Sequence, residues 1–115
     1  MQTWDDKLPI YQQLADRLSA HLLDGDPPEG QALPSVRALA GQYLINPLTV
    51  SRALATLGDA DLVENRRGLG LFVKPGAREA LRHSERRRFL EQDWPQLRLR
   101  LKRLGIQPAD LNWGE

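Results

Sequence analysis

The sequence contains no cysteine and only two histidines among its 115 residues. Without cysteine there is no disulfide framework and no thiolate metal site, and the composition suits a reducing cytoplasm. His21 and His83 are isolated, with no partner at metal-ligand spacing. No apolar run approaches the roughly 20 residues that cross a membrane, and the acidic opening at Asp5 and Asp6 is unlike a signal peptide. We therefore expect a cytoplasmic protein with no metal, no cofactor and no membrane association.

Signatures of catalysis are missing as well. The sequence has no nucleophile elbow, no phosphate-binding loop and no paired carboxylates. A chain of 115 residues fits one domain with a short appendage, which leaves no room for a separate catalytic or ligand-binding domain. We predict that the protein is not an enzyme.

Positive charge is unevenly distributed, although the net charge is only +1. Residues 1–61 hold four basic side chains against eight acidic ones, whereas residues 77–105 hold nine basic against four acidic. The location of the positive charge therefore says more about a nucleic-acid partner than its total does. We interpret Arg82 and the run Arg86-Arg87-Arg88 as the solvated face of a helix, in preference to a surface that binds nucleic acid.

Three helices are expected in the first half of the chain. Apolar residues between Ile10 and Leu22 recur at helical spacing and predict a helix over about residues 9–24. Ser35 is a good N-cap for a second helix, and Asn46-Pro47 caps and starts a third over about residues 47–58. Only about three residues separate the second helix from the third, as a helix-turn-helix requires.

The third helix is the candidate recognition helix. Its apolar residues recur at i, i+3, i+4 and i+7 and are expected to face inward; they are Val50, Ala53, Leu54 and Leu57. Thr49 and Arg52 then point outward, and the turn that starts at Asn46 offers an amide, hydroxyls and a guanidinium. Asparagine can pair with adenine, arginine with guanine, and threonine can contact a thymine methyl group. An ordinary solvated helix face is the alternative interpretation.

A glycine-centred hairpin follows the third helix. Residues 62–65 and 71–73 predict two strands, and Gly68 and Gly70 supply the positive φ values of a sharp reversal. Arg66 and Arg67 at its tip can follow phosphates or reach the minor groove, and Arg37 in the second helix can bind a phosphate. A solubilising turn and a surface ion pair are the alternatives for these arginines. Three polar or basic tips in this order predict a winged helix-turn-helix that binds DNA.

The remainder of the chain is expected to be helical. Lys74-Pro75-Gly76 marks a break, which separates a winged domain at residues 1–75 from a short helical segment at residues 76–115. One helix is predicted from residue 77 to about residue 92, and Pro95 interrupts it and starts a further helix that Gly105 ends. The predicted fold class is mainly α with a small β-hairpin.

Four stretches of the sequence resemble a known family. They are PIYQQL at residues 9–14, LPSVRALA at 33–40, NPLTVSRA at 46–53 and RRGLGLFV at 66–73. Together they span about residues 9–74 and resemble the GntR family of bacterial transcription regulators. The short C-terminal part resembles the YtrA-like subfamily, which has only about two helices after the winged domain.

This resemblance implies a homodimer that binds double-stranded DNA at a palindromic operator and dimerises through residues 76–115. YtrA-like members are often autoregulatory repressors of operons that encode ABC transporters, so we expect a repressor. The residues assigned to DNA binding are Ser35, Arg37, Asn46, Pro47, Leu48, Thr49, Ser51, Arg52, Arg66, Arg67, Gly68, Leu69 and Gly70. The residues assigned to dimerisation are Leu81, Phe89, Leu90, Trp94, Leu97, Leu101 and Leu104.

Two alternatives stay open at this point. An unknown small-molecule effector would have to bind between helices or at the subunit interface, because the C-terminal segment is too short to enclose a sizeable pocket. The competing function is a protein-interaction module that uses the winged helix as a scaffold and binds no DNA.

The sequence departs from the family pattern at three leucines. Leu44 holds a turn position where members often have glycine, and a non-glycine residue at positive φ costs about 1 kcal/mol or more. We therefore expect this turn to be shaped differently. Leu48 stands where relatives are often polar, and Leu71 where threonine is frequent in the wing, so we expect the operator to differ as well.

Overall fold

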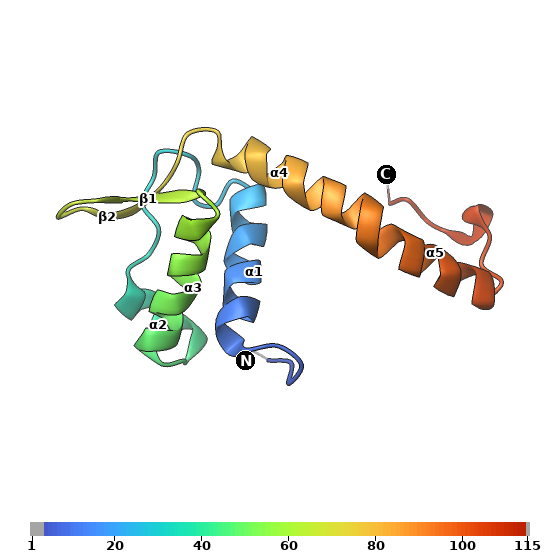
Figure 1. The fold of residues 1–115 in the computed structure, drawn as a ribbon, viewed down its shortest axis with the longest axis horizontal. Helices are drawn as coiled ribbons and strands as arrows, with labels where there is room; N and C mark the ends of the chain where they lie inside the picture. Colours follow the sequence, from blue (N-terminus) through green and yellow to red (C-terminus); the bar gives the residue numbers. More distant parts are fainter. Residues whose placement is uncertain (1–3, 115) are drawn as a thin grey trace. The chain divides into compact units, whose positions relative to one another are not determined.

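The computed structural model describes residues 4–114 (Figure 1). In chain order the elements are α1 (Ile10–Leu23), α2 (Val36–Tyr43), α3 (Pro47–Asp59), β1 (Val63–Arg66), β2 (Gly70–Val73), α4 (Ala77–Arg88), η1 (Phe89–Asp93), α5 (Trp94–Arg103) and η2 (Pro108–Asp110). Two compact units divide the chain: a winged unit that ends at Leu81 and a C-terminal unit that begins at Arg82. The mainly helical fold with one hairpin confirms the predicted fold class. The predicted winged domain begins at residue 1 and the predicted helical segment ends at residue 115. Both of these residues lie outside the described range.

Helices α1 and α3 form the centre of the winged unit, where they lie side by side (Figure 1). Leu14 of α1 and both Val50 and Ala53 of α3 have no exposed surface. The four inward positions predicted for α3 are all buried. Leu39 of α2 and Val73 of β2 join the same core, so a single apolar cluster holds the helices and the hairpin together.

The turn between α2 and α3 contains Leu44 in the left-handed conformation, with φ 57° and ψ 48°. The expectation of a differently shaped turn is wrong, because leucine adopts here the backbone that glycine would adopt. Its neighbours explain why: Tyr43 is buried in the core, and Ile45 is partly buried and packs against it. The chain must therefore reverse at Leu44. The Leu44 side chain is 82% exposed, so its burial adds nothing to the stability of the fold.

The hairpin is tied to the segment that leads into α2. Strand β1 pairs antiparallel with β2, with Val63 opposite Val73. The Gly30 N–H donates to the carbonyl of Val73 at 2.9 Å, and the Val73 N–H donates to Gln31 at 3.0 Å. The Leu33 N–H donates to the carbonyl of Leu71 at 2.8 Å. These backbone bonds fix the wing relative to the first turn of α2.

Glu29 connects the loop after α1 to the start of α4. Its carboxylate accepts the N–H of Gly76 at 2.9 Å and the N–H of Arg78 at 3.1 Å. The Arg78 Nε donates in turn to the carbonyl of Leu23 at 2.7 Å. The two backbone bonds, with the nearby Arg78 charge, hold the pKa of Glu29 below its usual value. An anionic side chain thus satisfies the N–H groups at the first turn of α4.

Residues 77–103 run as one continuous helix through α4, η1 and α5. Pro95 lies in the first turn of α5, as predicted, but the predicted interruption of the helix at this residue is wrong. The reason is the π turn of η1, in which the Trp94 N–H donates to the carbonyl of Phe89, five residues back. A proline ring clashes with the carbonyl four residues before it, and the wider π turn accommodates the missing N–H without ending the helix. None of the residues 82–114 is buried.

The left-handed Leu44 makes a stability prediction. Leu44→Gly should raise the free energy of unfolding by about 0.5–1 kcal/mol, because relief of the left-handed strain exceeds the entropy that glycine adds to the unfolded chain. Urea unfolding at one protein concentration measures the change. Leu48→Gly is the matched control, since Leu48 is 77% exposed within α3 and its loss should destabilise by a similar amount. Destabilisation by both Leu44→Gly and Leu48→Gly would contradict the presence of backbone strain at Leu44.

The lowered pKa of Glu29 predicts a pH-dependent contribution to stability. The carboxylate stabilises the fold above the pKa that it has in the unfolded chain, and this stabilisation is lost as the pH falls through its lower folded value. Wild type should therefore unfold at a higher temperature than Glu29→Gln at pH 7, and the difference should shrink between pH 5 and pH 3. A melting difference that stays constant over this range would show that the carboxylate charge is irrelevant.

Candidate nucleic-acid interface

The helix-turn-helix begins each of its helices with a side-chain cap. The Ser35 Oγ accepts the N–H of Ala38 at 3.0 Å, and the Asn46 Oδ1 accepts the N–H of Leu48 at 2.8 Å. These oxygens stabilise the helix starts, as the cap assignment predicted from the sequence. Neither the amide NH₂ group of Asn46 nor the hydroxyl proton of Ser35 has an acceptor among residues 4–114, so both can donate to a ligand.

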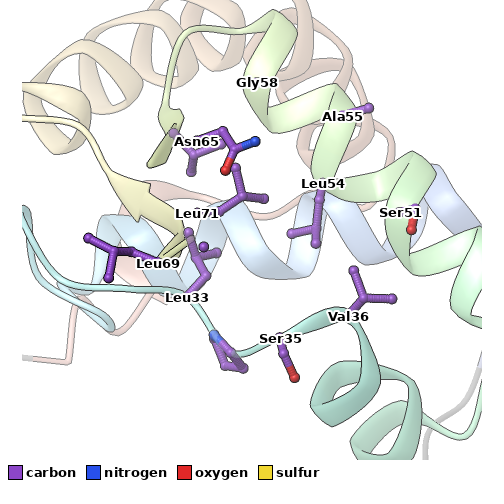
Figure 2. Close-up of a pocket in the computed structure, with 13 residues that line it drawn as sticks. Leu33, Ser35, Val36, Ser51, Leu54, Ala55, Gly58, Asn65, Leu69 and Leu71 are labelled. Atoms are coloured by element: carbon purple, nitrogen blue, oxygen red, sulfur yellow. The ribbon is translucent and has the colours of Figure 1, made fainter. Parts of the chain in front are cut away.

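A groove of about 580 Å³ lies between α3 and the hairpin, and we name it the α3–wing groove (Figure 2). The segment before α2 contributes Ser35, α3 contributes Ser51, and the hairpin contributes Leu69 and Gly70. Four of the residues assigned to DNA binding from the sequence thus meet in one hollow, although they come from three segments. Figure 2 shows the amide of Asn65, a β1 residue not among those assigned to DNA binding, on the same groove.

Other assigned residues lie on the exposed first turns of α2 and α3. Arg37 is exposed at the second position of α2, and it forms no ion pair within residues 4–114. Pro47 and Leu48 are exposed at the first two positions of α3, and Thr49 is half-buried. The first turns therefore present one cation, one exposed leucine and the capping amide of Asn46.

The wing holds its two arginines differently. Arg66 is the last residue of β1, where its guanidinium lies 3.4 Å from the Glu64 carboxylate and 4.2 Å from the ring centroid of Phe72. Arg67 lies in the turn that the Leu69 N–H closes by donating to the carbonyl of Arg66 at 2.8 Å. Arg67 is exposed and forms no ion pair among the described residues. Within the described range, Arg67 is therefore the wing arginine without an ion pair.

Arg52 does not line the α3–wing groove. Its guanidinium carbon lies 4.0 Å from the ring centroid of Tyr11, in the first turn of α1. The spacing within α3 predicts an outward side chain, which the exposed position confirms, but it carries no information about a ring on another helix. The contact with Tyr11 was therefore not predictable from the periodicity of α3.

The residues assigned to dimerisation fall into two groups. Leu81 is only 7% exposed and belongs to the core of the winged unit. The other six lie at the surface of the C-terminal unit, where Leu101 is half-buried and the rest are exposed: Phe89, Leu90, Trp94, Leu97 and Leu104. The arginine run of the same unit forms ion pairs along the helix, from Arg88 to Glu85 at 2.9 Å and from Arg87 to Glu91 at 3.9 Å.

The part of the chain that the structure describes contains neither a cluster of metal-ligating side chains nor a helix that could span a membrane. Residues 4–114 contain no group of three or more histidines or carboxylates placed to hold a metal ion. No helix within the same range combines the length and the apolar character that crossing a membrane requires.

A helix-turn-helix followed by a two-stranded wing, with polar and cationic tips on three segments, defines the winged helix-turn-helix class of DNA-binding domains. The model of the bacterial regulatory proteins of the gntR family matches residues 10–73, more than half of the chain. The chain therefore belongs to the GntR family of bacterial regulatory proteins, as the sequence motifs predicted.

The chain is also similar to individual curated regulators. The HTH-type transcriptional repressor YtrA of Bacillus subtilis is 37% identical over 73 residues, which are 64% of this chain and 56% of YtrA. The chain spans about half the length of YhcF and YtrA, the curated Bacillus subtilis relatives that it matches.

Solved structures extend the likeness beyond the winged unit. A GntR family transcriptional regulator from Listeria monocytogenes superposes with a TM-score of 0.75 at 28% identity and covers 92% of this chain and 91% of its own. The DNA-binding domain of AraR in complex with operator ORR3 is 25% identical, with a TM-score of 0.56, and covers 64% of this chain and 88% of its own.

Proposed function

We propose that the protein is a sequence-specific transcription regulator that acts in the cytoplasm as a homodimeric repressor of its own operon. It binds an inverted repeat in double-stranded DNA. Two comparisons support this proposal: the relative YtrA is described as a transcriptional repressor, and the AraR domain is described in complex with an operator. The observation that carries the proposal is the meeting of α2, α3 and the wing around the α3–wing groove.

In this proposal the exposed arginines bind the DNA backbone and so position the protein along the duplex. Residues in the first turns of α3 recognise the base sequence. Arg37 and Arg67, which form no ion pair in the part of the chain that the structure describes, bind phosphates. Asn46, Thr49 and Ser51 contact base edges in the major groove, and each good pair discriminates by about 1–3 kcal/mol. Leu48, which is exposed in the first turn of α3, suits a contact with a thymine methyl group, the apolar feature of the major groove.

Dimerisation supplies the second half-site. A single winged unit buries too little surface for tight specific binding, so two units must act together. Residues 82–114 form no buried core, and they expose five large apolar side chains of the assigned set. A second copy of the chain would cover these side chains and place two recognition helices about one helical turn of DNA apart.

The two wing arginines provide a matched test of DNA binding. Arg67→Ala should lower the slope of log K against log salt concentration by about 1, because it removes one phosphate contact. Arg66→Ala should lower it less, since its charge is already compensated by Glu64. Fluorescence anisotropy measures both slopes on a duplex that wild-type protein selects from random-sequence DNA.

The same titration separates the proposal from its alternative. A protein-interaction module on this scaffold would show no salt-dependent DNA binding at all, and no duplex would be enriched by selection. Equal slopes for wild type and Arg67→Ala, together with tight wild-type binding, would place the phosphate contacts elsewhere.

The exposed leucines of α5 test the role of the dimer. Leu97→Asp should give a monomer in sedimentation and lower the affinity for the selected dyad about 100-fold, because the two half-sites are no longer bound together. Leu99→Asp is the matched control, since Leu99 is 49% exposed and lies two residues further, on the opposite face of the helix. A Leu97→Asp protein that remains dimeric would remove α5 from the proposed interface.

A further inference from the structure

The contact between Tyr11 and Arg52 joins α1 to the recognition helix. The Arg52 guanidinium carbon lies 4.0 Å from the ring centroid, within the range of a cation–π interaction. Tyr11 is half-buried and packs against the core of the winged unit, so the ring is a fixed surface. The Gln12 Nε2 donates to the Tyr11 hydroxyl oxygen at 3.2 Å, which further limits motion of the ring.

The guanidinium donors of Arg52 have no acceptor among the residues that the structure describes. A guanidinium that stacks on a ring face keeps its N–H groups in the plane of the guanidinium, at its edge. Within residues 4–114 the Arg52 guanidinium forms no ion pair and donates no hydrogen bond. Arg66 provides the contrast, because it also stacks on a ring but donates to Glu64. Arg52 is therefore oriented by a ring and is exposed with its donors free.

We infer that Tyr11 is a positioning residue that holds Arg52 in the orientation in which it binds the operator. This inference rests on the proposed DNA-binding function. The stack restricts the flexible arginine before binding, so less side-chain entropy is lost when DNA is bound. The bound chemistry is a pair of acceptors in one plane, either O6 and N7 of a guanine or two oxygens of a phosphate.

A double-mutant cycle tests the inference on the duplex selected by the wild-type protein. Tyr11→Leu should weaken binding about 3- to 10-fold, because it removes the stack. Tyr11→Phe is the matched control: it retains the ring and should bind like wild type. In the Arg52→Ala background, Tyr11→Leu should have no further effect on affinity. Non-additivity of this kind distinguishes positioning of Arg52 from a general effect of Tyr11 on folding.

Two results would overturn the inference. One is an equal loss of affinity from Tyr11→Leu in both backgrounds; the other is a loss from Tyr11→Phe as large as that from Tyr11→Leu. Failure of the wild-type protein to bind any selected duplex would instead refute the proposed function itself.

The source of the two acceptors is separable in the same experiment. Replacement of single guanines in the duplex by 7-deazaguanine removes N7 only. If Arg52 binds guanine, one such position should weaken wild-type binding and leave Arg52→Ala unaffected. If it binds phosphate, no position should do so, and Arg52→Ala should lower the salt slope by about 1.

Discussion

The packing of α1 against α3 is the constraint on which the rest of the winged unit depends. Leu14, Val50 and Ala53 are fully buried at this contact, so the face of α3 that points inward is fixed. The remaining faces of α3 contact α2 and the hairpin or are open to solvent. Because α3 cannot rotate without exposing this core, the residues of its first turns keep one direction relative to the wing.

Backbone hydrogen bonds extend this rigidity to the segments around α3. The chain from Gly30 to Leu33 pairs with β2 and then enters α2 through the cap at Ser35. One short segment therefore connects the wing to the first helix of the helix-turn-helix. The three surfaces proposed to contact DNA share this scaffold, so their spacing is set by main-chain geometry and not by flexible side chains.

Local signals in the sequence were sufficient for the helices and the hairpin, because caps and apolar periodicity act within a few residues. Ser35 and Asn46 cap the helices that they were expected to cap. The misjudged turn at Leu44 shows where a local rule fails: its cost of about 1 kcal/mol is small beside the burial of the flanking residues. The surroundings of Arg52 and Arg66 depend on rings elsewhere in the fold, which no spacing within one element reveals.

The π turn before Pro95 sets the rotational phase of the C-terminal helix. In η1 the residues five apart, Phe89 and Trp94, occupy successive turns, where an α-helix would align residues three or four apart. The π turn thus contains one residue more than an α-helical turn. Phe89 lines the same shallow hollow as Leu97. Deletion of one residue from η1 would turn Phe89 by about 100° around the helix axis, away from the face that carries Leu97. A relative with an unbroken α-helix here would need its apolar residues shifted by one position to present the same stripe.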